Sequence, residues 1–205
     1  MIYIPSTWLL VPALTIVGTG GMLVLLQARR IGFGALLVQY GCSALLLTAV
    51  MPLRVVLIKV AVGVLTTAIL YLTDVATADK SFRQQEDGAA VGVRFRFIAY
   101  VIVIIASYGV YASRWIQIPV PEDPLLLGAI FLIASGLFQI GIFQSSYAIG
   151  IGMITFVTGF EVVYTALEPS LAMVALLAAV HLGLALVISY LELIPSGDRL
   201  KEPEA

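Results

Sequence analysis

The run YAIGIGMITFVTGFEVVYTAL, residues 147–167, carries one charged side chain, Glu161. At a rise of 1.5 Å per residue, a helix of this length spans about 30 Å, the thickness of the hydrocarbon core of a bilayer. Backbone polar groups find no water inside lipid, so a segment that crosses a membrane satisfies them as a helix. The run therefore predicts a transmembrane helix with a single acid inside it.

Similar apolar runs fill most of the chain. Hydrophobic residues make up 61% of the 205 residues and charged residues 11%, with a mean hydropathy of +1.07. A soluble domain has about 25% charged residues, so this composition favours a bilayer as the solvent. We predict an all-α integral membrane protein with about seven transmembrane helices, which lie at 8–27, 31–51, 53–73, 97–113, 124–144, 147–167 and 170–193.

The polar segments divide these helices into three, one and three. Residues 1–73 form a three-helix membrane module, and residues 74–123 hold a polar loop and a linker helix. Residues 124–194 form a second three-helix module, followed by a polar tail at 195–205. The loop at 74–96 carries four acids and four bases, and it is either a solvated connector or a docking surface for a cytoplasmic partner.

Lysine and arginine are unevenly shared between the two sides of this arrangement. Cytoplasmic segments hold the excess of these residues. With the N-terminus outside, eight of them fall inside and two, Arg54 and Arg114, fall outside, leaving out Lys59 in mid-helix. We therefore expect the N-terminus outside and the C-terminus in the cytoplasm. The first helix lacks the basic start of a signal peptide, so we expect it to be retained.

Composition also limits the chemistry. The net charge is −1, which gives no reason to expect nucleic acid as a partner. The chain has one cysteine, Cys42, and one histidine, His181, so we expect no intrachain disulfide, no metal site and no cofactor. The sequence offers no catalytic centre, because phosphate loops, zinc motifs and Ser/His/Asp sets are missing from it.

Glu161 is the first of three titratable residues predicted to lie inside the membrane. A charge there is costly, and such residues usually face a partner or a water path. Thr158 and Thr165 share the helix face of Glu161, and Tyr164 lies beside that face. Burial disfavours the charged form of a carboxylic acid and a nearby cation favours it. Glu161 is thus a candidate for a proton path, with two alternatives: a structural bond to another helix, or a misplaced helix boundary.

Lys59 and His181 are the other two candidates. Lys59 lies seven residues after Pro52 and either snorkels to the outer surface or pairs internally with a carboxylate and passes protons. His181 is near the centre of the last helix and either packs in the core or titrates near neutral pH. Four further polar residues either join helices by hydrogen bonds or line a water wire: Gln39, Ser43, Ser135 and Gln139.

These charged positions and their flanks resemble a known family. Gly159-Phe160-Glu161 matches the Gly-hydrophobic-Glu motif in the middle helix of the three-helix membrane subunit K of respiratory complex I, and Gly183-Leu184-Ala185-Leu186 resembles a stretch of the helix that follows in that subunit. Over residues 25–193 the chain resembles a longer relative, the membrane component E of hydrogenase-4. Ile58-Lys59-Val60-Ala61-Val62, and Arg30 before Ile31-Gly32-Phe33, fit that component.

The resemblance implies a membrane subunit of a complex I-like or membrane-bound-hydrogenase-like assembly in the cell inner membrane. It would lie among antiporter-like and other membrane subunits, and Glu161, Lys59 and His181 would help to translocate protons or sodium ions. Thr158, Thr165 and Tyr164 would support them. The subunit K family also has an acid in its last helix, where this chain offers His181 as the nearest titratable residue.

Two other functions remain open from the residues alone. A stand-alone transporter of small solutes could be built from two parallel three-helix repeats joined by the linker helix. A purely structural membrane subunit could use its buried charges for packing.

Overall fold

The computed structural model describes residues 6–26, 29–77, 92–113 and 123–193. All regular elements in these ranges are α-helices: α1 (Ser6–Leu25), α2 (Arg29–Leu47), α3 (Leu53–Thr77), α4 (Val93–Ser113), α5 (Asp123–Ile142), α6 (Ser146–Leu167) and α7 (Leu171–Leu193). Each is long and apolar enough to cross a membrane. The prediction of an all-α multi-pass membrane protein with seven spans is confirmed.

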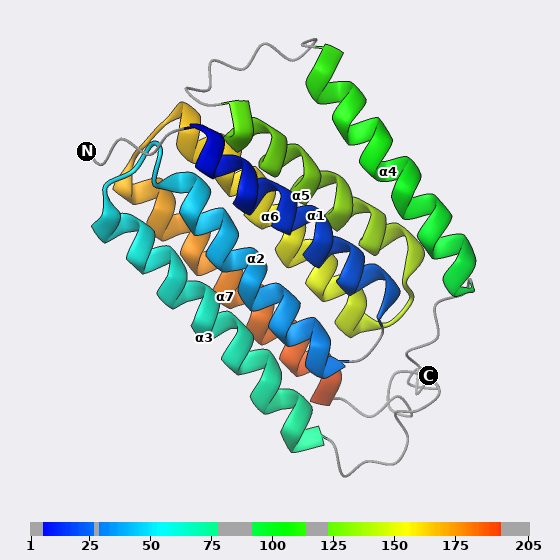
Figure 1. The fold of residues 1–205 in the computed structure, drawn as a ribbon. Coiled ribbons are helices and arrows are strands. Elements are labelled where there is room, and N and C mark those ends of the chain that lie inside the picture. The colour runs from blue at the N-terminus through cyan, green and yellow to red at the C-terminus, as the bar shows by residue number, and fades with distance from the viewer. Residues whose placement is uncertain (1–5, 27–28, 78–91, 114–122, 194–205) are drawn as a thin grey trace, which may run out of the picture.

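Six of the helices form two layers of three (Figure 1). The layer of α1, α2 and α3 packs face to face on the layer of α5, α6 and α7, so that α1 contacts α5, α2 contacts α6 and α3 contacts α7. Helix α4 lies on the flank of the bundle, against α5 and α1. The charged residues of α3, α6 and α7 therefore meet between the layers, because α3 packs on α7 and α6 packs on α7 and α2.

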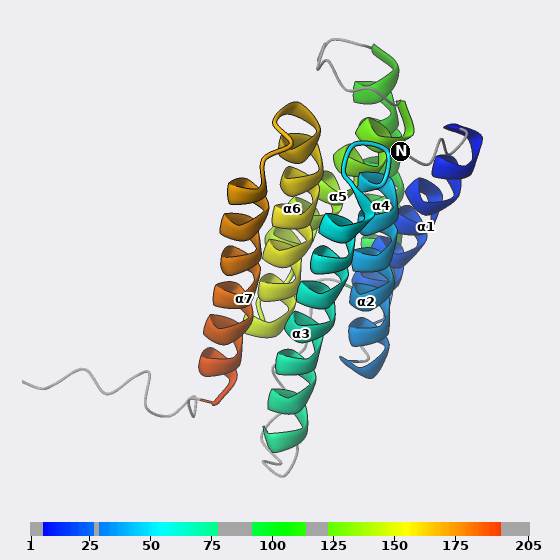
Figure 2. The same ribbon diagram turned by 90° about the vertical axis from the view of Figure 1, so that its left-hand side faces the viewer.

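Successive helices run in opposite directions, as Figure 2 shows for α2, α3, α6 and α7. The bundle therefore has two ends, which we name after one residue at each. The Arg29 end holds the starts of α2, α4 and α6, and the Pro52 end holds the starts of α3, α5 and α7. The distribution of lysine and arginine predicts that the Arg29 end faces the cytoplasm.

Glycines bring α5 and α6 into close contact. A Cβ atom on Gly136 would lie 2.5 Å from the backbone nitrogen of Phe156, and one on Gly159 would lie 2.7 Å from Cβ of Leu132. Small residues allow the backbones of membrane helices to approach in this way. The glycine before Phe160-Glu161 therefore has a packing role, and it fixes the height of Glu161 relative to α5.

Three helix boundaries differ from the prediction by four residues. Helix α2 ends at Leu47, α3 continues to Thr77, and α4 begins at Val93, so part of the expected loop at 74–96 is helical. For α4 the reason is visible at Arg96, which is 3% exposed and donates from Nη1 to the carbonyl oxygen of Val24, 3.0 Å away. A cation is favourable at the carbonyl end of a helix, here α1. The remaining loop residues, 78–91, and the tail at 195–205 lie outside the described residues.

Candidate functional site

Lys59 and Glu161 form an ion pair inside the bundle. Lys59 projects from α3 and Glu161 from α6, and the Lys59 Nζ lies 2.5 Å from the Glu161 Oε2. Lys59 is 4% exposed and Glu161 3%, so neither side chain reaches the surface of the chain. Each residue lies six positions from the Pro52 end of its helix, about 9 Å along the helix axis. Lys59 therefore pairs internally and does not snorkel.

His181 brings a third helix to this pair. Its Nδ1 lies 3.8 Å from the same Glu161 Oε2, and the residue is 1% exposed. It is the eleventh residue of the 23 in α7, at the middle of that helix. The structure thus places all three predicted membrane charges in one cluster, which we name the Lys59–Glu161–His181 cluster.

The two ring nitrogens of His181 have different partners. Nδ1 lies 2.8 Å from the carbonyl oxygen of Leu177, and a carbonyl only accepts, so Nδ1 carries a hydrogen. Nε2 lies 3.2 Å from the hydroxyl oxygen of Thr158. That hydroxyl also lies 2.8 Å from the carbonyl of Ile154, to which it can donate.

The Thr158 hydroxyl is thereby coupled to the protonation of His181. A neutral ring with hydrogen on Nδ1 accepts at Nε2, so Thr158 donates to it. A protonated ring donates from Nε2, so the Thr158 hydroxyl turns and donates to Ile154 instead. In both states the two ring nitrogens of His181 and the Thr158 hydroxyl keep a hydrogen-bond partner, so this arrangement can accommodate either form of the ring.

Tyr40 of α2 packs against both bases of the cluster. Its ring centroid lies 5.5 Å from that of His181, edge to face, and the Lys59 Nζ lies 5.6 Å from the Tyr40 ring. Gly63 on α3 makes room for it, because a Cβ there would lie 2.6 Å from the Tyr40 Cγ. Nothing in the sequence singles out Tyr40, since neither its spacing nor its neighbours along the chain point to charges on α3 and α7.

The face of α6 that carries Glu161 is polar over about three helical turns. Thr155, Thr158, Glu161 and Thr165 are all buried there, at spacings of three and four residues that place them in one stripe. The Thr155 hydroxyl donates to the Gln39 Oε1 of α2, at 3.2 Å. The interpretation of Gln39 as a link between helices therefore fits its contact, and Thr155 extends a periodic pattern that was readable in the sequence.

Three other polar residues behave differently from the expectation. Tyr164 is turned away from the cluster and donates to Glu168 Oε2 at 3.2 Å, because at i+3 it lies on the other side of Glu161 from Thr165. Ser43 and Ser135 donate to carbonyls of their own helices and so join no pair of helices through those bonds. Thr165 lines a small cavity beside Lys59 and Glu161.

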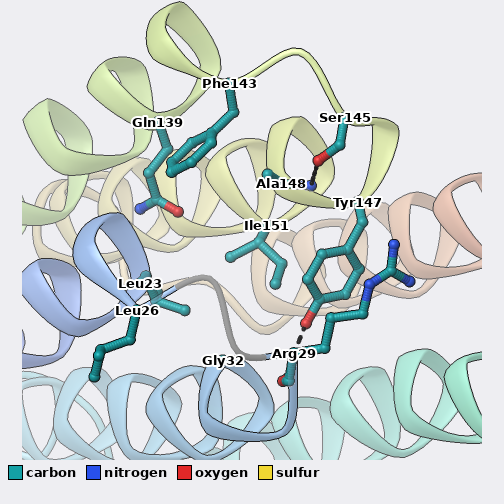
Figure 3. Close-up of a pocket in the computed structure, with 10 residues that line it drawn as sticks. All are labelled: Leu23, Leu26, Arg29, Gly32, Gln139, Phe143, Ser145, Tyr147, Ala148 and Ile151. Carbon is teal, nitrogen blue, oxygen red and sulfur yellow. Dashed lines mark hydrogen bonds between the residues drawn. The ribbon is translucent and has the colours of Figure 1, made fainter. Parts of the chain in front are cut away.

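A second polar group lies at the Arg29 end. The Arg29 Nη1 lies 3.2 Å from Asp74 Oδ1 and 2.9 Å from Glu192 Oε2, which ties the start of α2 to the ends of α3 and α7. Its guanidinium carbon lies 4.7 Å from the centroid of the Tyr147 ring. A pocket with about 430 Å³ of empty space opens beside it, between α1, α2, α5 and α6, and Figure 3 shows its lining.

The cluster suits a proton better than a metal ion. Within the described ranges, His, Cys, Asp and Glu residues form no group of three that could hold a metal. Sodium and other hard cations prefer several oxygen ligands, whereas the carboxylate here faces the ammonium group of Lys59 and an imidazole. The arrangement places one acid between two bases, with the ammonium group at hydrogen-bond distance from the carboxylate and the imidazole 3.8 Å from it.

Comparisons of the chain with models of protein families, with curated proteins and with solved structures find no match.

Proposed function

We propose that this chain is a membrane subunit of a redox-driven ion pump, of the complex I-like or membrane-bound-hydrogenase-like kind, in the cell inner membrane. It has no catalytic centre or cofactor of its own in this proposal, and electrons move on partner chains. The observation that carries the proposal is the Lys59–Glu161–His181 cluster, in which two bases from two transmembrane helices lie within 4 Å of the Glu161 Oε2 on a third. The proposed role of the cluster is proton translocation.

The energetics of the ion pair support a role beyond packing. Taking two charges out of water costs several kcal/mol per ion, and a buried pair is often no more stable than an apolar pair of the same volume. Leucine and methionine at these positions would hold α3 and α6 together equally well. A charge that can change its protonation state gives a reason to keep the pair, and the hydroxyl of Thr158 supplies the adjustable partner that His181 needs.

The position of the cluster favours exchange with a partner chain through the side of the bundle. A small cavity of about 10 Å³ adjoins the cluster and is lined by Ile58 and Val62 of α3 and by Val174 and Ala178 of α7. Ile58 is exposed on the face of α3, so only one layer of apolar side chains separates the cluster from the outer face of these two helices. We propose that antiporter-like subunits pack on this face and receive protons from Glu161 or Lys59.

The proposed assembly is tested by its composition. The native protein is extracted in mild detergent, isolated through a tag on one terminus, and every chain that stays bound is identified by mass spectrometry. The proposal expects antiporter-like membrane subunits together with iron–sulfur or flavin subunits. Isolation of a monomer or a homo-oligomer that moves a solute in vesicles would contradict it and would favour the transporter built from two parallel repeats.

The proposed ion is tested in vesicles that contain the isolated assembly. In buffer free of sodium, electron transfer should acidify one side of the membrane at the same rate as in buffer with sodium, because the cluster exchanges protons. Acidification that depends on added sodium would contradict a proton role and would assign sodium as the ion.

A further inference from the structure

We propose that the pocket at the Arg29 end is the water entrance to the Lys59–Glu161–His181 cluster, so that the cluster takes up protons from one side of the membrane only. The inference rests on the proposed function, since an entrance matters for a site that exchanges protons. The observations behind the entrance differ from those behind the proposed function. They are the positions of buried polar atoms and apolar side chains along α6.

The entrance is a polar opening among apolar helices. Arg29, Ser145, Tyr147 and Gln139 supply polar groups to its lining, and Gln139 lies three residues before the end of α5. Figure 3 shows the Gln139 side chain extending from α5 toward Leu23, with Ile151 to one side of it. Gln139 is buried, and among the described residues its Nε2 has no hydrogen-bond partner. A buried amide nitrogen of this kind is most often satisfied by water.

A line of polar groups leads from this amide to the cluster. Gln139 packs against Gly152 of α6, where a Cβ would lie 2.9 Å from the Gln139 Cβ. Thr155, Thr158 and Glu161 follow Gly152 at steps of three residues, about 4.5 Å each along the helix. Beside Thr155, the Gln39 Nε2 of α2 is a second buried amide nitrogen with no partner in the described part of the chain.

The other side of Glu161 is built differently. Between the cluster and the Pro52 end, α2, α3, α6, α7 and the connection from α2 to α3 contribute an apolar group of buried residues that includes Leu47, Met51, Val55, Val56, Ala166 and Val174. Among the described residues, Thr165 is the one polar residue that lines the cavity on this side besides Lys59 and Glu161 themselves, and a water needs two or more polar partners. Apolar residues pack on the Arg29 side too, but there successive polar groups are provided by Gln139, Gln39, Thr155 and Thr158. The approach to Glu161 from the Arg29 side is therefore the more polar of the two, which favours access from that side.

The test uses single cysteines and a reagent that travels with water. Cys42 is the sole cysteine and is buried, so Cys42→Ser gives a thiol-free background. Thr155→Cys places a thiol on the proposed path, and Ala166→Cys places one on the same helix beyond Glu161, in the apolar group. Two vesicle preparations are used, one with the Arg29 end of the protein facing the outside and one with the Pro52 end facing the outside. Silver ion is added outside in chloride-free buffer, and the unreacted thiols are counted by intact-protein mass spectrometry.

We expect Thr155→Cys to react from the Arg29 side roughly tenfold faster than Ala166→Cys, because a thiol in dry apolar surroundings forms little of the reactive thiolate. Adding Gln139→Leu should slow Thr155→Cys several-fold, while Ser135→Ala, which changes the same helix one turn away, should leave its rate unchanged. Gln39→Cys gives the same measurement from α2 if Thr155→Cys does not fold.

Equal rates for the two cysteines, or faster reaction from the Pro52 side, would overturn the entrance. The readout does not require pumping, so the two proposals fail separately. One-sided reactivity in a protein whose Glu161→Gln variant pumps normally would leave the entrance standing and remove the proposed function. If Glu161→Gln abolishes pumping but Thr155→Cys does not react, the proposed function would stand and the entrance would be overturned.

Discussion

Lys59 on α3 and Glu161 on α6 are separated by 102 positions in the sequence, and their side chains meet at 2.5 Å between Nζ and Oε2 in the interior of the bundle. The pair joins the two layers of helices at one point, and His181 and Thr158 complete the polar group around it. Each of the two charges is therefore the main electrostatic compensation for the other.

Removing one charge should destabilise the protein more than removing both. Lys59→Met and Glu161→Gln each leave a buried charge without its partner, which costs about 3–5 kcal/mol. The double variant leaves no charge at either position and should recover most of that loss. Thermal unfolding in detergent of the four proteins of this cycle measures the coupling. Additive losses in the double variant would show that the two side chains do not compensate each other.

His181 should be found with hydrogen on Nδ1. It is the sole histidine, so ¹⁵N-histidine labelling gives one pair of nitrogen signals. We expect Nδ1 to be protonated at high pH because it faces the Leu177 carbonyl at 2.8 Å. Thr158→Val should shift the Nε2 signal and cost about 1–3 kcal/mol through an unpaired ring nitrogen, and Thr158→Ser should restore both. A ring with hydrogen on Nε2 alone would contradict the arrangement.

Gly63→Ala should disturb the cluster from a distance. The new Cβ would lie 2.6 Å from the Tyr40 Cγ, so the ring that contacts His181 and Lys59 must move. Overpacking of this kind costs about 1–3 kcal/mol. Gly34→Ala is the matched control, because a Cβ there meets nothing within 4 Å. Unfolding temperature and the ¹⁵N signals of His181 report the effect, and equal behaviour of the two variants would contradict the close packing of Tyr40 on α3.

Arg29→Gln should loosen the Arg29 end of the bundle. The substitution removes the cation that faces Asp74 and Glu192, and these pairs are partly exposed, so we expect a loss of about 1 kcal/mol. Amide hydrogen exchange should rise at the last turns of α3 and α7, while exchange at the Pro52 end stays unchanged. Arg54→Gln, an exposed arginine at the Pro52 end, is the control, and an equal effect of both variants would contradict the network.

The sequence was sufficient to predict the seven spans, because hydropathy over 20 residues reports membrane solvation directly. Lys59, Glu161 and His181 could be singled out for the same reason: a charge in lipid stands out. Their mutual contact could not be predicted. It depends on the packing of α3 against α7 and of α6 against α7 and α2, and this packing is set by side-chain shapes that a hydropathy average does not contain. Tyr40 shows the limit most clearly, because its importance depends on Gly63 of another helix.

The start of α4 was misplaced for a related physical reason. Arg94 and Arg96 look like loop residues in a hydropathy profile, yet Arg96 is buried where it bonds the carbonyl of Val24. The partner of Arg96 is the end of another helix, α1. The residues next to Arg96 in the sequence therefore give no indication that its charge is buried. The polar stripe on α6 was partly readable, since Thr158 and Thr165 were assigned to the face of Glu161, and Thr155 continues the same period.

The proposed function requires Glu161 to change its protonation during ion pumping. Its most direct test is proton pumping per electron by the assembled complex in vesicles, with wild-type protein, Glu161→Gln, Glu161→Asp and Glu168→Gln, each checked for equal incorporation of the chain. Glu168 is an exposed acid just beyond the same helix and serves as the matched control. The account predicts that Glu161→Gln loses most of the pumping, that Glu161→Asp keeps part of it, and that Glu168→Gln keeps all of it. Pumping by Glu161→Gln at the wild-type ratio would contradict the account.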